Sequence, residues 1–138
     1  MADIFTPKKR RSIMQAVRQK GTTPEQTLTE KLRELGYRFR RNEDRLPGRP
    51  DVYFPWAKLV VFVHGCFWHG HAGCRKGRSR PKTRRRYWEE KISRNQRRDR
   101  RVARSLREAG YSVYTVWECE LRKGQIPKRL LTRLANAR

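Results

Sequence analysis

The sequence is poor in acidic residues, in cysteine and in long apolar stretches. Its 138 residues include 36 Lys or Arg but only 13 Asp or Glu, so the formal net charge is +23. Such a surface repels itself unless a polyanion lies against it, which makes nucleic acid the first partner to consider. The longest unbroken apolar run covers only residues 59–63, whereas a membrane-spanning helix needs about 20 apolar residues. We therefore expect no membrane span.

The start of the chain lacks the features of a secretory signal. No apolar stretch follows the charges of MADIFTPKKRR, so we expect a cytoplasmic protein. The length favours one compact domain. We expect a basic segment, residues 1–20, that contacts DNA, and a single domain over residues 21–138. No exposed heptad pattern or long apolar stripe requires a second copy, so a monomer is expected.

Apolar periodicity predicts both helices and strands along the chain. A threonine cap at residues 22–23 and Pro24 open a helix that ends at Gly36. Its apolar stripe consists of Leu28, Leu32 and Leu35. Further elements are expected as strands at 37–39, 51–54, 59–63 and 111–117, and as helices at 87–109 and from Pro127 onward. Residues 75–86 are basic and almost free of apolar side chains, and we expect them to be mobile without a ligand.

The segment from residue 59 to residue 117 has the order strand, long helix, strand. The inward stripe of the helix consists of Trp88, Ile92, Asp99, Val102 and Leu106. A βαβ crossover of this kind places its two strands in parallel. The predicted fold class is therefore α/β, with a small mixed β-sheet flanked by helices.

The three cysteines and three histidines are concentrated in one loop. Five of these six residues lie within residues 64–74. Thiolates together with an imidazole suit tetrahedral Zn²⁺, and the parallel strands of the crossover bring the end of the last strand beside this loop. We predict a closed structural zinc site whose ligands are Cys66, His71, Cys74 and Cys119. The alternative is a set of unrelated buried thiols and a surface histidine.

Asp51 stands at the start of a predicted strand in a chain that has few acids. In a basic cleft that binds phosphates, a lone carboxylate weakens binding unless it holds a divalent cation such as Mg²⁺. The carbonyl of Val63 is a candidate second ligand. His64 and His69 remain free once zinc has taken the third histidine, and an imidazole can orient or deprotonate water. The alternatives are a strand-edge turn for Asp51 and packed or solvated histidines.

Four motifs resemble the very short patch repair mismatch endonucleases. They are LPGRPD at 46–51, VHGCFWH at 63–69, YWxxKIxxNxxRD at 87–99 and VWEC at 116–119. That family nicks one DNA strand beside a T:G mismatch left by deamination of 5-methylcytosine. The resemblance implies a restriction-endonuclease-like core with a structural zinc. It also implies a magnesium-dependent, strand-nicking endodeoxyribonuclease of bacterial type that acts on nucleoid DNA.

The same resemblance assigns catalytic roles by position. The residues concerned are Asp51 as magnesium ligand with the carbonyl of Val63, His69 as acid–base residue, His64 as its essential neighbour, and Glu25 at the water shell of the metal. The family commonly has Thr in place of Val63, and a backbone role survives that change. For Glu25, a capping box with Thr22 is an equal alternative. The loop before Cys74 is one residue longer than the family pattern, which leaves His69 as an alternative zinc ligand to His71.

A strongly basic stretch predicts how DNA is held. Residues 75–107 contain sixteen Lys or Arg and three acids, too few acids to pair the basic side chains along a helix. Phosphate neutralisation explains this excess better than a solvated helix face does, and it predicts steeply salt-dependent binding.

Aromatic residues near the predicted cluster are candidates for reading the mismatch. Phe67 and Trp68 either pack under the zinc loop or face DNA; the resemblance implies that they wedge into the base stack, with Met14 entering from the other groove. The alternative for Met14 is a core contact of a short helix. Lys91 and Asn95 are implied to act at the mismatched pair. Trp88 shares their helix face and belongs either with them or in the core.

We therefore expect a metal-dependent nickase whose partner is mismatched double-stranded DNA and whose cofactors are Zn²⁺ and Mg²⁺. One alternative is a restriction-type or structure-specific nuclease without mismatch preference. The other is a non-catalytic, zinc-containing DNA-binding module.

Overall fold

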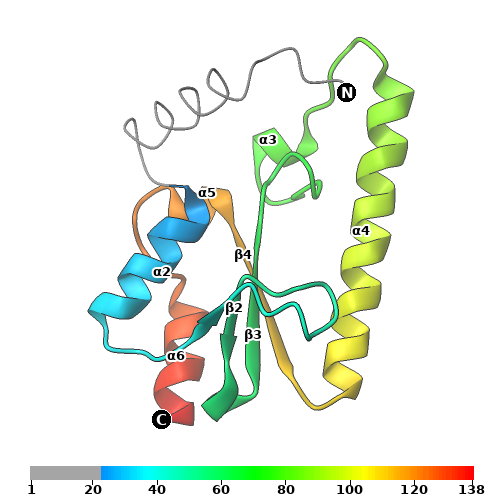
Figure 1. The fold of residues 1–138 in the computed structure, drawn as a ribbon. Coiled ribbons are helices and arrows are strands. Elements are labelled where there is room, and N and C mark those ends of the chain that lie inside the picture. The colour runs from blue at the N-terminus through cyan, green and yellow to red at the C-terminus, as the bar shows by residue number, and fades with distance from the viewer. Residues whose placement is uncertain (1–22) are drawn as a thin grey trace, which may run out of the picture.

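The computed structural model describes residues 23–138, so the predicted DNA-contacting segment 1–20, including Met14, lies outside the described residues. The elements are α2 (Pro24–Glu34), β1 (Arg40–Arg41), β2 (Val52–Phe54), η1 (Pro55–Ala57), β3 (Leu59–His64), α3 (Arg75–Arg78), α4 (Arg85–Glu108), β4 (Ser112–Trp117), α5 (Glu118–Leu121) and α6 (Lys128–Ala137) (Figure 1). Among these residues, no helix combines the length and the apolar character that crossing a membrane requires.

The four strands form one mixed sheet in the order β1-β2-β3-β4. β2 pairs antiparallel with β1 and β3, whereas β3 pairs parallel with β4 from Leu59 opposite Ser112 to His64 opposite Trp117. α4 is the crossover between the two parallel strands. The predicted α/β class and its βαβ unit are confirmed, and the ends of β3 and β4 lie side by side.

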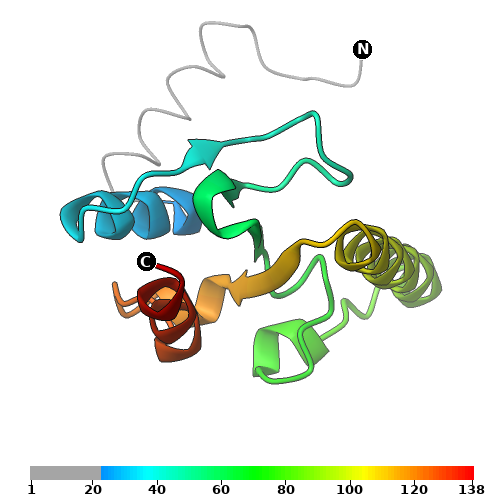
Figure 2. The same ribbon diagram turned by 90° about the horizontal axis from the view of Figure 1, so that it is seen from below.

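Helices cover both faces of the sheet (Figures 1 and 2). On one face, Leu59 and Val61 join leucines of α2 and α6 in the larger core. On the other face, Val60 and Phe62 pack with Leu106 of α4. This alternation follows from the period of two along a strand, and burial of β3 on both faces explains its unbroken apolar sequence.

The N-terminal region departs from the prediction in three details. The capping box of α2 joins Thr23 and Gln26, one residue on from the predicted pair of Thr22 and Glu25. Leu28 and Leu32 are fully buried, but Leu35 is the C-cap and is 49% exposed. The first strand lies at 40–41 and not at 37–39, because pairing with β2 begins only at Arg40, opposite Tyr53, although the aromatic side chains at 37 and 39 both pack against the larger core.

The basic stretch 75–86 contains regular structure that the prediction missed. Residues 75–78 form α3, whose N-cap is Cys74, and α4 begins at Arg85. The N–H of Gly77 donates to the Cys74 sulfur at 3.4 Å. A Cβ at Gly77 would lie 2.0 Å from the His71 carbonyl oxygen, so only glycine allows this approach.

Candidate active site and metal centre

A cavity of about 220 Å³ opens where β3 ends. Asp51 lies at its edge just before β2, His64 ends β3, and His69 follows in the next loop. Asp99, on α4, lines the same cavity. The sheet and the crossover helix thus bring together the carboxylate and the two imidazoles that the sequence singled out, with one further acid.

Asp51 is held by backbone and half-buried. Its Oδ2 accepts a hydrogen bond from the Val63 N–H at 2.7 Å. Burial raises the pKa of the Asp51 carboxyl despite this bond, and the negative charge of Glu25 raises it further. A carboxylate that is desolvated in this way gains stability from a bound cation.

His64 and His69 form a stacked pair beside Asp99. Their ring centroids are 3.8 Å apart and their planes differ by 3°. His69 Nδ1 lies 2.6 Å from Asp99 Oδ2, and His64 Nδ1 lies 3.9 Å from the same oxygen. Burial, and then the neighbouring His69, lower the pKa of His64 to about 4, so His64 is neutral near pH 7. The carboxylate accepts from Nδ1–H of His69, which leaves Nε2 free to accept a proton.

Asp99 was missed as a site residue, although the sequence contained a signal for it. It is the one acid between Lys91 and Arg107, and it occupies the inward stripe of α4 together with Ile92 and Leu106. An acid on an apolar stripe requires a polar partner. Only the fold identifies that partner as His69, thirty positions away in sequence.

Glu25 does not belong to the capping box, so that explanation is wrong. Its Oε1 accepts from Arg41 Nη2 at 3.1 Å, and it is close enough to Asp51 to affect its pKa. The predicted contact of Glu25 with the metal's water shell remains a prediction.

The second group unites all three cysteines with His71. The donor atoms of Cys66, His71, Cys74 and Cys119 all lie within 4.8 Å of one another, so this group could hold a metal ion. His71, and not His69, therefore completes it. Burial raises the pKa of the Cys66 thiol to about 12, so a nearby cation would be needed to stabilise its thiolate.

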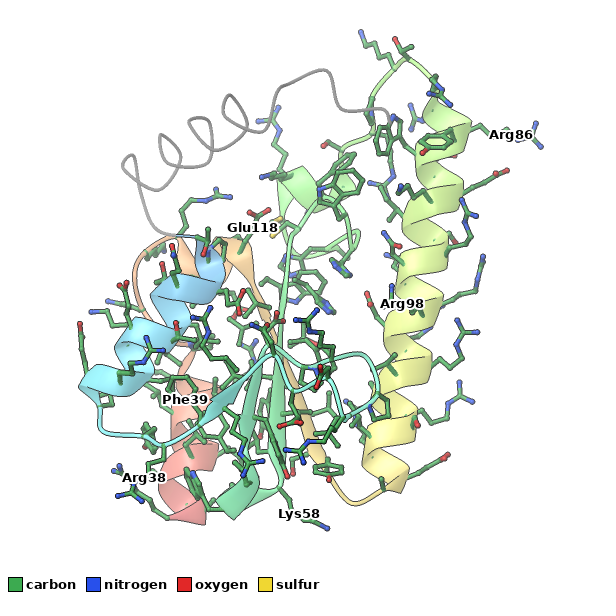
Figure 3. All side chains as sticks on the ribbon, in the orientation of Figure 1. Arg38, Phe39, Lys58, Arg86, Arg98 and Glu118 are labelled. Atoms are coloured by element: carbon green, nitrogen blue, oxygen red, sulfur yellow. The ribbon has the colours of Figure 1, made fainter. Side chains whose placement is uncertain are left out.

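Several contacts fasten this loop to the end of β4. Glu118 Oε1 accepts from the Cys66 N–H at 3.0 Å and lies 3.1 Å from Lys76 Nζ. The ring of Trp117 stacks on His71 with centroids 4.1 Å apart. Figure 3 shows Glu118 beside the sulfur atoms below α3. A polar loop without a core of its own is thus anchored to the sheet.

Aromatic side chains gather at the start of α4. The rings of Phe67, Trp68 and Trp88 contact one another, with centroids 5.4 to 5.6 Å apart. Trp68 is 47% exposed, and Lys91 Nζ lies 5.7 Å from the centre of its ring. Asn95 Nδ2 donates to the Trp68 carbonyl at 2.8 Å. The five predicted DNA-contacting residues on these elements therefore form one surface, in which Phe67 is half-buried and Trp68 is exposed.

A basic groove continues from this surface along α4. It is lined by Lys91, Arg94, Asn95, Arg97, Arg98 and Arg101. Arg98 also lines the cavity that holds Asp51, whereas Arg86 projects into solvent (Figure 3). The positively charged side chains of the groove thus extend to the cavity that contains the Asp51 carboxylate and the imidazoles.

A mixed sheet that brings an aspartate and two histidines together beside a basic helix is consistent with one class of protein, an α/β nuclease with a restriction-endonuclease-like core. Comparison with known proteins supports the same class. The family model described as "DNA mismatch endonuclease Vsr" matches residues 2–76, and the chain belongs to this family.

Three relatives illustrate the similarity. The type II nicking enzyme V.XorIIP of Xanthomonas oryzae is 50% identical over 121 residues, 88% of each chain. V.NmeAIP of Neisseria meningitidis is 42% identical over 97% of this chain and 94% of its own. The DNA mismatch endonuclease Vsr of Escherichia coli is 42% identical over 88% of this chain and 77% of its own. The protein is thus an endonuclease of the mismatch-directed or nicking kind whose substrate is DNA.

Proposed function

We propose that the protein is a magnesium-dependent endonuclease that nicks one strand of duplex DNA beside a T:G mismatch. The observation that carries this proposal is the cavity shared by Asp51, His64, His69 and Asp99 at the end of a basic groove. Phosphodiester hydrolysis needs a cation for the developing charge and a base for the attacking water. Both kinds of group face this one cavity.

Asp51 and the carbonyl of Val63 are the proposed protein ligands of Mg²⁺. Magnesium binds oxygen atoms and keeps several waters, and a desolvated carboxylate beside a second acid, Glu25, suits a cation. When bound, Mg²⁺ polarises the scissile phosphate and stabilises its developing charge. Glu25 is proposed to contact the water shell of the ion.

His69 is the proposed general base. Asp99 holds the His69 ring with its Nδ1–H toward the carboxylate, so Nε2 takes the proton of the attacking water. Asp99 is a positioning residue, and its negative charge stabilises the imidazolium that forms. His64 is neutral and stacks against His69, which restricts the orientation of the base.

Zn²⁺ is the proposed occupant of the cysteine-rich group. Tetrahedral zinc, with bonds of about 2.3 Å to sulfur and about 2.0–2.1 Å to nitrogen, puts these two ligand atoms about 3.6 Å apart. His71 Nδ1 lies 3.7 Å from Cys66 Sγ and 3.5 Å from Cys119 Sγ. Four protein ligands leave no open position, as in a structural site.

Mismatch preference is proposed to come from the aromatic surface. Inserting a side chain between bases costs a few kcal/mol of unstacking, and a wobble pair lowers that cost. Phe67 and Trp68 would enter the stack, while Lys91 and Asn95 lie beside them. The ring of Trp88 contacts both of their rings. Residues 1–20, with Met14, are proposed to contact the same DNA, and the protein is proposed to act as a monomer.

Cleavage of a duplex panel tests this proposal. End-labelled duplexes that differ only in one base pair, matched or T:G or another mismatch, would be incubated with the protein and either Mg²⁺ or a chelator. We expect one nick, in one strand, on the T:G duplex with Mg²⁺. Equal cleavage of the matched duplex or double-strand breaks would favour a restriction-type nuclease. Binding without cleavage under any condition would favour a silent DNA-binding module.

A further inference from the structure

The active-site cavity contains a second set of metal-ligand atoms apart from Asp51. The donor atoms of His64, His69 and Asp99 all lie within 4.8 Å of one another. They come from three elements: the end of β3, the following loop and the middle of α4. None of them belongs to the cysteine-rich group or to the proposed magnesium ligands.

The chemistry of these donors differs from that of the proposed magnesium site. Two imidazoles and one carboxylate suit Zn²⁺, Co²⁺ or Ni²⁺, whereas Mg²⁺ prefers oxygen alone. Tetrahedral Zn²⁺ would hold a nitrogen and an oxygen ligand about 3.4 Å apart. The Nδ1 atoms of His69 and His64 lie 2.6 and 3.9 Å from Asp99 Oδ2, so these distances need to change by less than about 1 Å.

Chelation also requires one ring to turn. An ion lies near the plane of each imidazole that binds it, and here the two planes are parallel with ring centroids 3.8 Å apart. Both rings border open volume. His64 and His69 line the active-site cavity of about 220 Å³ and also a second cavity of about 630 Å³ that borders β4 and α4. A turning ring therefore meets open volume.

We propose that His64, His69 and Asp99 form an inhibitory site for a zinc-type ion, distinct from the cysteine-rich group. An ion there would replace the proton between His69 and Asp99 and would fix the base in a non-productive orientation. Binding is independent of the nuclease assignment, whereas the inhibition rests on the proposed function. The thiolate site would fill first, and the second ion would bind more weakly.

Cobalt binding tests the site directly. The full-length protein, already loaded with one equivalent of Zn²⁺ and kept in excess Mg²⁺ to occupy the proposed Asp51 site, would be titrated with Co²⁺ and followed by visible absorption. We expect one further equivalent with d–d bands and no thiolate charge-transfer band. Asp99→Ala should weaken this second binding at least tenfold. Asp51→Asn is the matched control from the same cavity, and it should leave the binding unchanged.

Loss of the second equivalent in Asp51→Asn, or its full retention in Asp99→Ala, would overturn the ligand assignment. A wild-type protein that binds only one ion would overturn the site itself.

Inhibition is measured separately, by nicking of the T:G duplex in Mg²⁺ with added Zn²⁺. We expect the rate to fall at least tenfold and to recover when a chelator selective for Zn²⁺ is added. A second ion bound with no loss of rate would overturn the inhibitory role. A protein that binds the second ion but nicks no duplex, even without it, would refute the proposed function and leave the binding site standing.

Discussion

Replacement of Asp99 by Asn tests the assignment of His69 as a base. The carboxylate lies 2.6 Å from His69 Nδ1, slightly closer than the distance of about 2.7–2.9 Å that charge-assisted N–H···O hydrogen bonds usually have. Asn removes the charge with little change of volume, so it no longer stabilises the imidazolium and no longer fixes the productive tautomer. General-base catalysis contributes about 10²–10⁴-fold, and loss of an orienting aspartate has cost about 10⁴-fold in a hydrolase of another fold.

We therefore expect Asp99→Asn to lower the single-turnover nicking rate by about 10²–10⁴-fold. The assay uses saturating enzyme on a T:G duplex, with DNA affinity measured in parallel by fluorescence anisotropy. Affinity should stay equal or rise slightly, because a negative charge has left a basic groove. Asp44→Asn, at an exposed position outside both cavities, is the charge-matched control. A rate within about threefold of wild type in a folded Asp99→Asn protein would refute the assignment.

Three further changes probe the metal centre, the DNA surface and the core. Cys119→Ser should lose the bound metal and lower the melting temperature sharply, as shown by metal analysis and a thermal melt; a metal-replete and equally stable variant would contradict the ligand set. Trp68→Ala should reduce the preference for the T:G duplex by about tenfold in competition binding, and an equal loss on matched DNA would indicate a packing role. Leu106→Ala, at a fully buried position, should cost about 2–5 kcal/mol in a urea melt, whereas a cost below about 1 kcal/mol would mean that α4 packs more loosely than described.

The βαβ crossover could be predicted because the apolar pattern of its sequence is strong both in the strands and in the helix. The apolar run of β3 suits a strand that is buried on both faces, and Ile92 and Leu106 mark the inward stripe of α4. The sequence-based predictions were wrong where tertiary contacts, rather than the local sequence, determine the structure. Leu35 continues the leucine spacing but lies at the helix end, where no core covers it. α3 forms although its sequence is basic, because the Cys74 sulfur and Gly77 organise the turn.

The metal-ligand group could be predicted because cysteine and histidine are scarce and clustered in the sequence. Cys119 could be added to this group because parallel strands end at the same edge of the sheet, which places the end of β4 beside the loop after β3. The pairing of His69 with Asp99 could not be predicted, because a helical stripe specifies which face is inward but not which loop covers it. The stacking of His64 on His69 likewise depends on how the loop turns after β3.

The proposed catalysis depends above all on Asp51, the residue that serves the catalytic cation. Its most direct test is the single-turnover nicking rate of Asp51→Asn on a T:G duplex, measured over a range of Mg²⁺ concentrations beside DNA affinity. A rate at least about 10³-fold below wild type, with unchanged affinity and melting temperature, is the result predicted here. A variant that nicks within tenfold of wild type at the same Mg²⁺ concentration would contradict it.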